Sequence, residues 1–262
     1  MANTLEGTVV LVTGGAGGLG KVIAKSYLDA GAQVAICDIN AERLEQTSQE
    51  FEQSSPGRSY SQKTDITDEA AVGQFVDAVV ARFGRLDVLV NNAGMADTFD
   101  PVGTLTKERW DRVLGLNLTG SFLTTRAAVN AMEAQTPPGG IVIQIGSVAS
   151  SFGMSAGLAY TVSKHGVAAL VKSTAGFYGP KGIYAIGLMV GSMMGTNIID
   201  SFQTLGGRNV EAFQQTTGAS FKPESAIPLQ DVAKYCLFLT DRGIAASANG
   251  SCITFSRNSP AA

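Results

Sequence analysis

Short apolar runs rich in β-branched residues alternate along the whole chain with longer segments of helical period, and this alternation limits the available folds most. The apolar runs predict strands at 8–14, 33–38, 59–65, 86–94, 141–147, 183–191 and 251–255. The segments between them predict helices over 20–31, 41–51, 69–84, 107–133, 159–179 and 231–241. Apolar strands separated by helices are typical of a parallel sheet covered on both faces. We therefore predict an α/β fold with a single doubly wound parallel sheet.

No linker or repeat divides the 262 residues, so we expect one domain over 1–262. Residues 192–228, after the sixth strand, are too long for an ordinary connection and predict a substrate-binding lid. Within them Ile198, Ile199, Phe202 and Leu205 fall on one helical face. That face fits either a core-packing helix or an apolar lid that closes over a substrate.

The overall charge and the cysteines exclude several classes of protein. A net charge of −3 without a Lys/Arg cluster argues against nucleic-acid or anionic-membrane partners. The N-terminus lacks a signal-peptide pattern, and no apolar run approaches the ~20 residues of a spanning helix. Cys37, Cys236 and Cys252 are far apart, and with a single histidine they predict no metal site. We expect a protein of the reducing cytoplasm.

The run TGGAGGLG, Thr13 to Gly20, stands between the first predicted strand and its helix. Glycines there let the backbone turn tightly and approach a diphosphate at the helix N-terminus. Asp38 closes the second strand at the spacing of a carboxylate that binds ribose hydroxyls. Such a carboxylate repels a 2′-phosphate, and Ala16, Gly17 and Ile39 supply no cation, so we predict NAD rather than NADP. The alternative is a plain turn with Asp38 as a loop residue.

Further motifs follow in order: NNAG at Asn91–Gly94, Ser147 after the fifth strand, and Tyr160 four residues before Lys164. With the glycine run, their order and spacing mean that the chain resembles the short-chain dehydrogenase/reductase family over nearly its whole length. The resemblance implies a Rossmann fold and an NAD(P)-dependent oxidoreductase acting on a small-molecule alcohol or ketone. It also implies a homodimer or homotetramer formed through the long helices.

The resemblance carries over a set of site residues. Those expected to contact the cofactor are Gly14, Gly18, Leu19, Gly20, Asp38, Asp65, Asn91, Ala93, Gly94, Tyr160, Lys164 and Thr196. Those expected to be catalytic are Asn117, Ser147, Tyr160 and Lys164. Ser147 is expected to hold the substrate oxygen, and Asn117 to position a water linked to Lys164. An asparagine inside a long helix can also simply bond to the backbone.

The ordinary pKa values of tyrosine and lysine agree with the roles that the resemblance implies for Tyr160 and Lys164. An ordinary tyrosine has a pKa near ~10, too high for a base at neutral pH. A nearby ammonium favours the phenolate and shifts such a pKa by ~1–3 units. Tyr160 is therefore expected to exchange a proton with the substrate oxygen, with Lys164 lowering its pKa. His165 lies on another side of the helix, and we expect a packed or surface role for it.

The chain departs from the family pattern near its end. Ile186 stands where relatives often carry asparagine, Val190–Gly191 replaces Pro-Gly, and Thr196 is displaced by about one residue. SCITFSRN, at 251–258, lacks the usual Asp-Gly-Gly. These changes leave open a nucleotide-binding protein without turnover. A lyase or dehalogenase on the same fold is disfavoured because the lysine and the glycine loop are both present.

Apolar side chains are expected around the mouth of the substrate site: Met95, Phe152, Met154, Met193 and Met194. The only cations of the insertion are Arg208 and Lys222, so no clamp for CoA phosphates is evident. We therefore predict a neutral, fairly bulky secondary alcohol or ketone, in a step of secondary metabolism.

Overall fold

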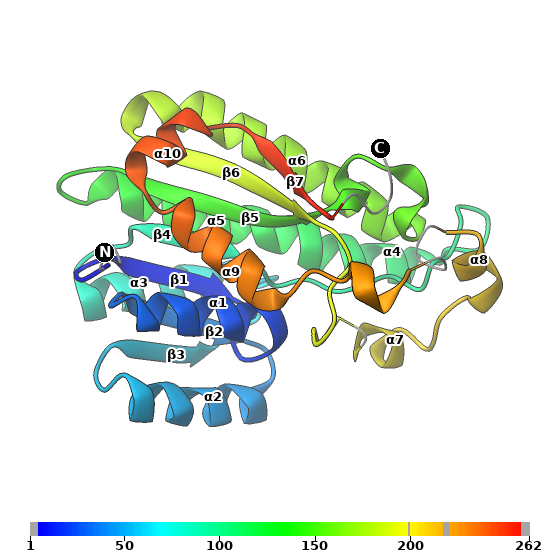
Figure 1. Ribbon diagram of the computed structural model, residues 1–262, viewed down its shortest axis with the longest axis horizontal. Helices are drawn as coiled ribbons and strands as arrows, with labels where there is room; N and C mark the ends of the chain where they lie inside the picture. The colour runs from blue at the N-terminus through cyan, green and yellow to red at the C-terminus, as the bar shows by residue number, and fades with distance from the viewer. Residues whose placement is uncertain (1–4, 199, 217–220, 258–262) are drawn as a thin grey trace.

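The computed structural model describes residues 5–198, 200–216 and 221–257. Its strands form one fully parallel sheet of seven, in the order β3-β2-β1-β4-β5-β6-β7 (Figure 1). The strands are β1 (Val9–Thr13), β2 (Gln33–Asp38), β3 (Ser59–Lys63), β4 (Val88–Asn91), β5 (Gly140–Ser147), β6 (Ile183–Val190) and β7 (Cys252–Phe255). The order reverses beside β1, which confirms the doubly wound α/β prediction.

Helices cover both faces of the sheet. On one face lie α1 (Gly18–Asp29), α2 (Ala41–Ser54), α9 (Leu229–Phe238) and α10 (Arg242–Ser247). On the other lie α3 (Glu69–Phe83), α5 (Ser121–Ala134) and α6 (Leu158–Tyr178). Strand β1 is buried along its whole length between the two layers. This explains its unbroken apolar sequence, since both of its faces contact helices.

Helix starts follow the expected capping chemistry. Asn40 accepts a hydrogen bond from the Arg43 N–H at 2.9 Å, and Asp68 accepts two from the first turn of α3. Within one helical layer, the Tyr27 hydroxyl of α1 donates to the Cys236 carbonyl of α9 at 3.0 Å. The buried cysteine Cys236 therefore lies at the contact of two helices and acts as a small apolar residue.

The predicted helix over 107–133 is present, with helical backbone throughout, but its middle is π-helical. It consists of α4 (Lys107–Leu114), a π-helical stretch from Gly115 to Gly120, and α5. The π stretch contains Asn117 and has glycine at both ends. Such bulges are frequent at functional sites, and periodicity alone does not reveal them because each neighbouring turn keeps its α-helical pattern.

Residues 192–228 extend beyond the carboxyl ends of the strands, at the right of Figure 1. The helical face predicted from Ile198, Ile199, Phe202 and Leu205 is present only in part: α7 (Asp200–Thr204) contains Phe202, whereas Ile198 and Leu205 lie outside it. A second short helix, α8 (Val210–Gln214), follows. Ile199 lies outside the described residues. A parallel bridge between Met193 and Ile227 closes the base of the insertion. Within the described part of the chain, no helix has the length and apolarity to cross a membrane.

Candidate active site

The glycine run forms a tight turn between β1 and α1. Gly14 and Gly18 have positive φ angles of 63° and 49°. A Cβ on Gly20 would lie 2.1 Å from the Gly14 carbonyl oxygen, so only glycine fits there. Helix α1 begins after Gly17, and its first turn, including Leu19, has no acidic side chain. Its N-terminal N–H groups and dipole therefore favour an anion at this point.

Asp38 lies beside this turn, as its spacing predicted. Its carboxylate accepts hydrogen bonds from the Ala16 N–H at 3.3 Å and the Asn40 N–H at 2.9 Å. The structure also brings Arg43 to the turn, which sequence reasoning missed: a Cβ on Gly17 would lie 3.5 Å from Arg43 Cδ. Arg43 is paired with Asp200 of α7 at 3.2 Å. The sequence signal that could have identified Arg43 is its position in the first turn of the helix that follows Asp38.

The NNAG turn connects the glycine loop with Lys164. A Cβ on Gly14 would lie 3.0 Å from Ala93 Cα, and one on Gly94 would lie 3.7 Å from Lys164 Nζ. The missed residue Asn92 donates to the carbonyls of Thr13 and Gly14 at 3.0 and 3.2 Å and so fixes the loop. The glycine loop, Ala93, Gly94 and Lys164 thus form one continuous surface.

Asn91 and Asp65, both predicted to contact the cofactor, differ in their exposure. Asn91 is buried, and its side chain bonds Ser121, Thr124 and Thr125 of α5, so it joins β4 to that helix. Asp65 is exposed just beyond β3, where its carboxylate accepts from Thr67. Of these two, only Asp65 presents its side chain at the open edge.

Ser147, Tyr160 and Lys164 come together at the carboxyl end of β5. Ser147 is the last residue of that strand, and its hydroxyl accepts from the Ala149 N–H at 3.1 Å. Tyr160 and Lys164 project from the first turns of α6, with Lys164 Nζ 5.5 Å from the centre of the tyrosine ring. The buried Lys164 ammonium donates to the Ile145 carbonyl at 3.1 Å.

The expected lowering of the Tyr160 pKa by Lys164 is wrong for the free protein. Burial raises the pKa of Tyr160 to about 12; interaction with the Ser147 side chain lowers it, and the Asp97 carboxylate raises it. Burial also lowers the pKa of Lys164 to about 8. The two groups lie in one desolvated site, where the loss of hydration disfavours the charged form of each.

Asn117 is fully buried beneath this group. Its Oδ1 accepts from the Met95 N–H at 2.8 Å, while its Nδ2 donates to the Met95 carbonyl at 2.9 Å and to Ser163 Oγ at 3.1 Å. The side chain is thus bound to backbone, as the alternative reading of this asparagine held. Its backbone carbonyl accepts from Ser121 Oγ at 2.8 Å.

The remaining candidates lie around this centre. A Cβ on Gly18 would lie 3.1 Å from Thr196 Cα, so Thr196 is beside the glycine loop. Met95 is buried in a cluster with Leu205 and the ring of Tyr160, whereas Phe152, Met154 and Met194 are exposed. Met193 is half-buried at the base of the insertion. His165 is exposed and bonds only locally, to the Thr161 carbonyl, as expected.

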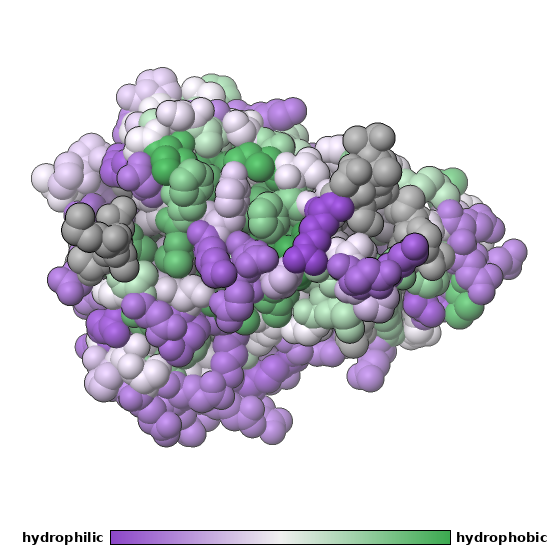
Figure 2. All heavy atoms as spheres, in the orientation of Figure 1, coloured by the Kyte–Doolittle hydropathy of each residue, from purple (hydrophilic) through white to green (hydrophobic). Residues whose placement is uncertain are grey.

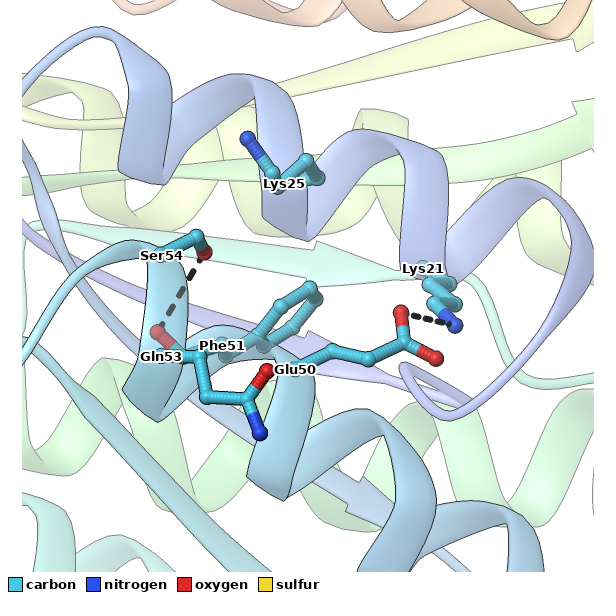
Figure 3. A pocket seen from close by; sticks show the side chains of 6 residues that line it. All are labelled: Lys21, Lys25, Glu50, Phe51, Gln53 and Ser54. Carbon is cyan, nitrogen blue, oxygen red and sulfur yellow. Dashed lines mark hydrogen bonds and ion pairs between the residues drawn. The ribbon is translucent and has the colours of Figure 1, made fainter.

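One surface hollow lies away from this group, between α1 and α2 (Figure 3). Phe51 forms its floor, and Lys21 and Glu50 form an ion pair of 2.6 Å across one end. None of Ser147, Tyr160 and Lys164 lines this hollow. Among the described residues, no group of three or more His, Cys, Asp or Glu side chains could hold a metal ion.

Comparisons with known proteins agree with this geometry. Residues 8–204 match the family described as short chain dehydrogenase. The chain is 44% identical to the short chain dehydrogenase/reductase dpchG of Colletotrichum higginsianum, covering 95% of this chain and 92% of that protein. It is 38% identical to the D-threitol dehydrogenase of Mycolicibacterium smegmatis, covering 68% and 67%.

A solved structure of the actinorhodin polyketide ketoreductase with NADPH superposes with a TM-score of 0.83 at 26% identity, covering 98% of each chain. The glycine turn before α1 and the Ser147, Tyr160 and Lys164 group lie beyond the carboxyl ends of the parallel strands, the edge at which open α/β sheets bind their ligands. The chain belongs to the short-chain dehydrogenase family and is an NAD(P)-binding oxidoreductase of alcohols and ketones.

Proposed function

We propose that Tyr160 is the acid/base of a reversible secondary alcohol–ketone oxidoreduction. The observation that carries this proposal is the meeting of Tyr160, Ser147 and Lys164 at the carboxyl end of β5, next to the Ala93–Gly94 surface. In oxidation, the alcohol proton passes to the Tyr160 phenolate oxygen as the C=O bond forms. A nicotinamide dinucleotide held by the glycine turn, Asp38 and Lys164 would supply the hydride acceptor for that carbon, and the hydride donor in reduction.

The other residues have supporting roles. The Ser147 hydroxyl donates to the substrate oxygen and fixes its position beside Tyr160. Lys164, when protonated, stabilises the phenolate and binds ribose hydroxyls of the cofactor. Asn117 anchors the Met95 backbone beneath this group, and its place in the π-helical stretch accommodates a water linked to Lys164.

Replacing Tyr160 by Phe tests this role, because it removes the hydroxyl and keeps the ring. General acid–base groups contribute ~10²–10⁴-fold, so we expect kcat to fall by at least about a hundredfold. NADH affinity, measured by fluorescence titration, should stay within about twofold. His165→Phe, one position outside the site, is the matched control and should keep its rate. Wild-type turnover in Tyr160→Phe would overturn the assignment.

For the cofactor we favour NAD over NADP. The residues present fit a dinucleotide: a turn that only glycine can make, an uncapped helix N-terminus, and the Asp38 carboxylate beside them. Asp38 disfavours a 2′-phosphate by charge repulsion. The second candidate is NADP, favoured by the nearness of Arg43 and by the NADPH of the polyketide ketoreductase structure.

The variant Asp38→Ser tests whether the Asp38 carboxylate sets the preference for NAD over NADP. It should raise kcat/KM for NADP relative to NAD by at least about tenfold, since one like-charge contact is worth more than ~1.4 kcal/mol. Arg43→Ala in the same background should reverse part of the gain, provided that Arg43 binds the phosphate. A wild-type enzyme that already prefers NADP would contradict our assignment.

For the substrate we propose a neutral, fairly bulky molecule, covered by 192–228 as a lid. Support comes from Leu205 of that segment, which packs with Met95 and Trp110 beside the Tyr160 ring. A spectrophotometric screen at 340 nm with 1-tetralol, cyclohexanol, a 3β-hydroxysteroid and D-threitol tests it, using NAD and NADP in turn. Highest kcat/KM on D-threitol would overturn the apolar assignment. A bulky alicyclic substrate would agree with a step in secondary metabolism.

We also expect a homo-oligomer in the cytoplasm. On α5 and α6, Phe122 and Phe177 are 44% and 76% exposed and line a shared hollow, which fits dimerisation. A second apolar area lies over α9 and the β6–β7 edge (Figure 2), and Phe238, the last residue of α9, is 51% exposed; both observations fit a tetramer. Analytical ultracentrifugation of Phe177→Glu should show a smaller species than the wild type. The buried Cys37 and Cys236 agree with a reducing compartment.

A further inference from the structure

The helix that carries Tyr160 and Lys164 lacks a cap from its own sequence. Its N-cap residue is Gly157, which has no side chain, and its first turn contains no acidic residue. The first N–H groups of a helix need acceptors, especially where they are buried. Here the acceptor comes from the segment after β4: Asp97 Oδ1 accepts from the Gly157 N–H at 3.1 Å, and Oδ2 accepts from the Tyr160 N–H at 2.9 Å.

Asp97 is itself held firmly. It is 2% exposed, and its Oδ1 also accepts from the Phe99 N–H at 3.1 Å. A Cβ on Gly157 would lie 2.5 Å from Asp97 Oδ2 and 2.6 Å from Phe99 Cα, so glycine is needed for the two segments to meet. Phe99 has a positive φ of 63°, a strained conformation for a bulky residue. Three hydrogen bonds and a tight backbone contact therefore fix the carboxylate.

The residues just before Asp97 reach the rest of the site. Met95 exchanges two backbone hydrogen bonds with the Asn117 side chain, and the Ala96 N–H donates to Ser201 Oγ of α7 at 3.1 Å. One short segment thus contacts the π-helical stretch, the proposed lid and the first turn of α6. Asp97 is its only contact with the backbone of Tyr160 among the described hydrogen bonds.

We infer that Asp97 is a positioning residue of the alcohol–ketone reaction: its carboxylate holds the first turn of α6 so that the Tyr160 hydroxyl faces Ser147. This inference rests on the proposed acid/base role of Tyr160. A negative carboxylate is also the favoured group at a helix N-terminus, where the dipole is positive. Without it, the turn that carries the tyrosine loses two of its hydrogen-bond acceptors.

The carboxylate has an electrostatic effect as well. Tyr160 faces Lys164 from its own helix, Ser147 from β5 and Asp97 from the segment after β4, with Asp100 adjacent to Asp97. Asp97 is the charged group that raises the pKa of Tyr160, after burial. Removing its charge therefore lowers that pKa. A merely structural cap would not produce this second effect.

Asp97→Asn in the full chain tests the inference. The substitution keeps the size, but its amide N–H₂ faces a backbone N–H in either orientation. With 1-tetralol, or the most active alcohol of the panel, we expect kcat to fall at least about tenfold while the NADH dissociation constant stays within about twofold. The pH of half-maximal kcat in alcohol oxidation should move down by at least about half a unit, because the phenolate is favoured.

Asp100→Asn is the matched control. Asp100 is equally buried and charged, but its side chain pairs with Arg109 at 2.8 Å and with Asn209 at 3.2 Å, and not with the first turn of α6. It should lower the melting temperature without moving the pH profile. Asp97→Ser is a second variant in case Asn does not fold, since a hydroxyl can still accept one N–H. The same fall in kcat and the same pH shift are expected for it.

The outcomes separate the two assignments. If Tyr160→Phe is inactive while Asp97→Asn or Asp97→Ser keeps the wild-type kcat and pH profile, the role of Asp97 is overturned and that of Tyr160 stands. If the Asp97 and Asp100 variants lose kcat equally and neither moves the pH profile, Asp97 is only structural and the inference fails. If Tyr160→Phe retains turnover, both assignments fall.

Discussion

The two sides of the site are built differently. The cofactor side, from β1 to β3, consists of regular strands and helices joined by a turn that only glycine can form. The proposed substrate side, made of residues 95–100 and the described parts of 192–228, consists of short helices and loops joined by bonds between side chains and backbone. In the proposed function, the first side binds an invariant ligand, the dinucleotide, through its backbone geometry. The second side can vary with the substrate because few backbone rules constrain it.

Contacts within the substrate side show how it holds together. The Asn209 N–H donates to the Thr98 carbonyl at 2.8 Å, and Arg112 donates to the Thr204 carbonyl at 3.0 Å. The Phe99 ring contacts the rings of Phe202 and Phe213, with centroids 6.0 and 4.8 Å apart. Each contact joins residues far apart in sequence, so this region depends on the finished fold.

The largest expected effect tests the cofactor side. Gly20→Ala places a Cβ 2.1 Å from the Gly14 carbonyl oxygen, so the turn must shift. We expect NADH affinity to fall by at least about a hundredfold and the free energy of unfolding by roughly 1–3 kcal/mol. Fluorescence titration and thermal denaturation measure both.

Gly73→Ala is the control for that substitution. It lies inside α3, where a Cβ would meet no atom of the described residues within 4 Å. Alanine there should stabilise the helix by up to about 1 kcal/mol and leave NADH binding unchanged. If Gly20→Ala bound NADH as tightly as Gly73→Ala does, backbone geometry would not explain the cofactor side.

An intermediate effect is expected on the substrate side. Leu205→Ala removes a buried side chain through which α7 packs beside Tyr160. Burial of a leucine is worth ~1.5–3 kcal/mol, so kcat/KM for a bulky alcohol should fall about tenfold, mostly through KM. NADH affinity should not change. Val210→Ala, on the exposed start of α8, is the control; equal losses in both variants would argue against a lid.

The smallest expected effect is on the pH dependence of stability. It is due to Lys164, which lies where the cofactor side and the substrate side meet. Burial lowers the pKa of Lys164 from 10.5 to about 8, so between these values the unfolded chain binds the additional proton. Stability contributed by this group therefore rises with pH across that window. Lys164→Met removes the penalty, and its advantage in melting temperature over the wild type should be greatest near pH 7.5 and smaller near pH 10.

The variant and the wild type are compared at the same pH. The contributions of other titrating groups therefore cancel in the difference between the two melting temperatures. Tyr160, whose pKa is raised to about 12, keeps its contribution to stability below pH 10 and loses it above that value in both proteins. Lys172→Met, at an exposed position of the same helix, is the control and should give a small margin that does not change with pH. A constant margin for Lys164→Met would show that Lys164 does not titrate in this window.

Much of the fold was predictable because its signals are local. Buried strands such as β1 are apolar up to their last residue, Thr13, and the glycine run marks the turn after it. The helix predicted over 107–133 is present, but its π-helical stretch was not predictable because the chain keeps a helical pattern on both sides of it. The expected pKa of Tyr160 failed because spacing along a helix carries no information about burial.

The sequence by itself determined the sheet, the helices, the family and the residues that meet at the end of β5, since periodicity and short motifs encode them. Only the tertiary structure decided that Arg43 reaches the glycine turn and pairs with Asp200. It likewise decided that Asp97, 63 positions before Tyr160, accepts from the N–H of that residue. These are contacts between distant segments, and their partners are fixed by the packing of the whole chain rather than by any local pattern.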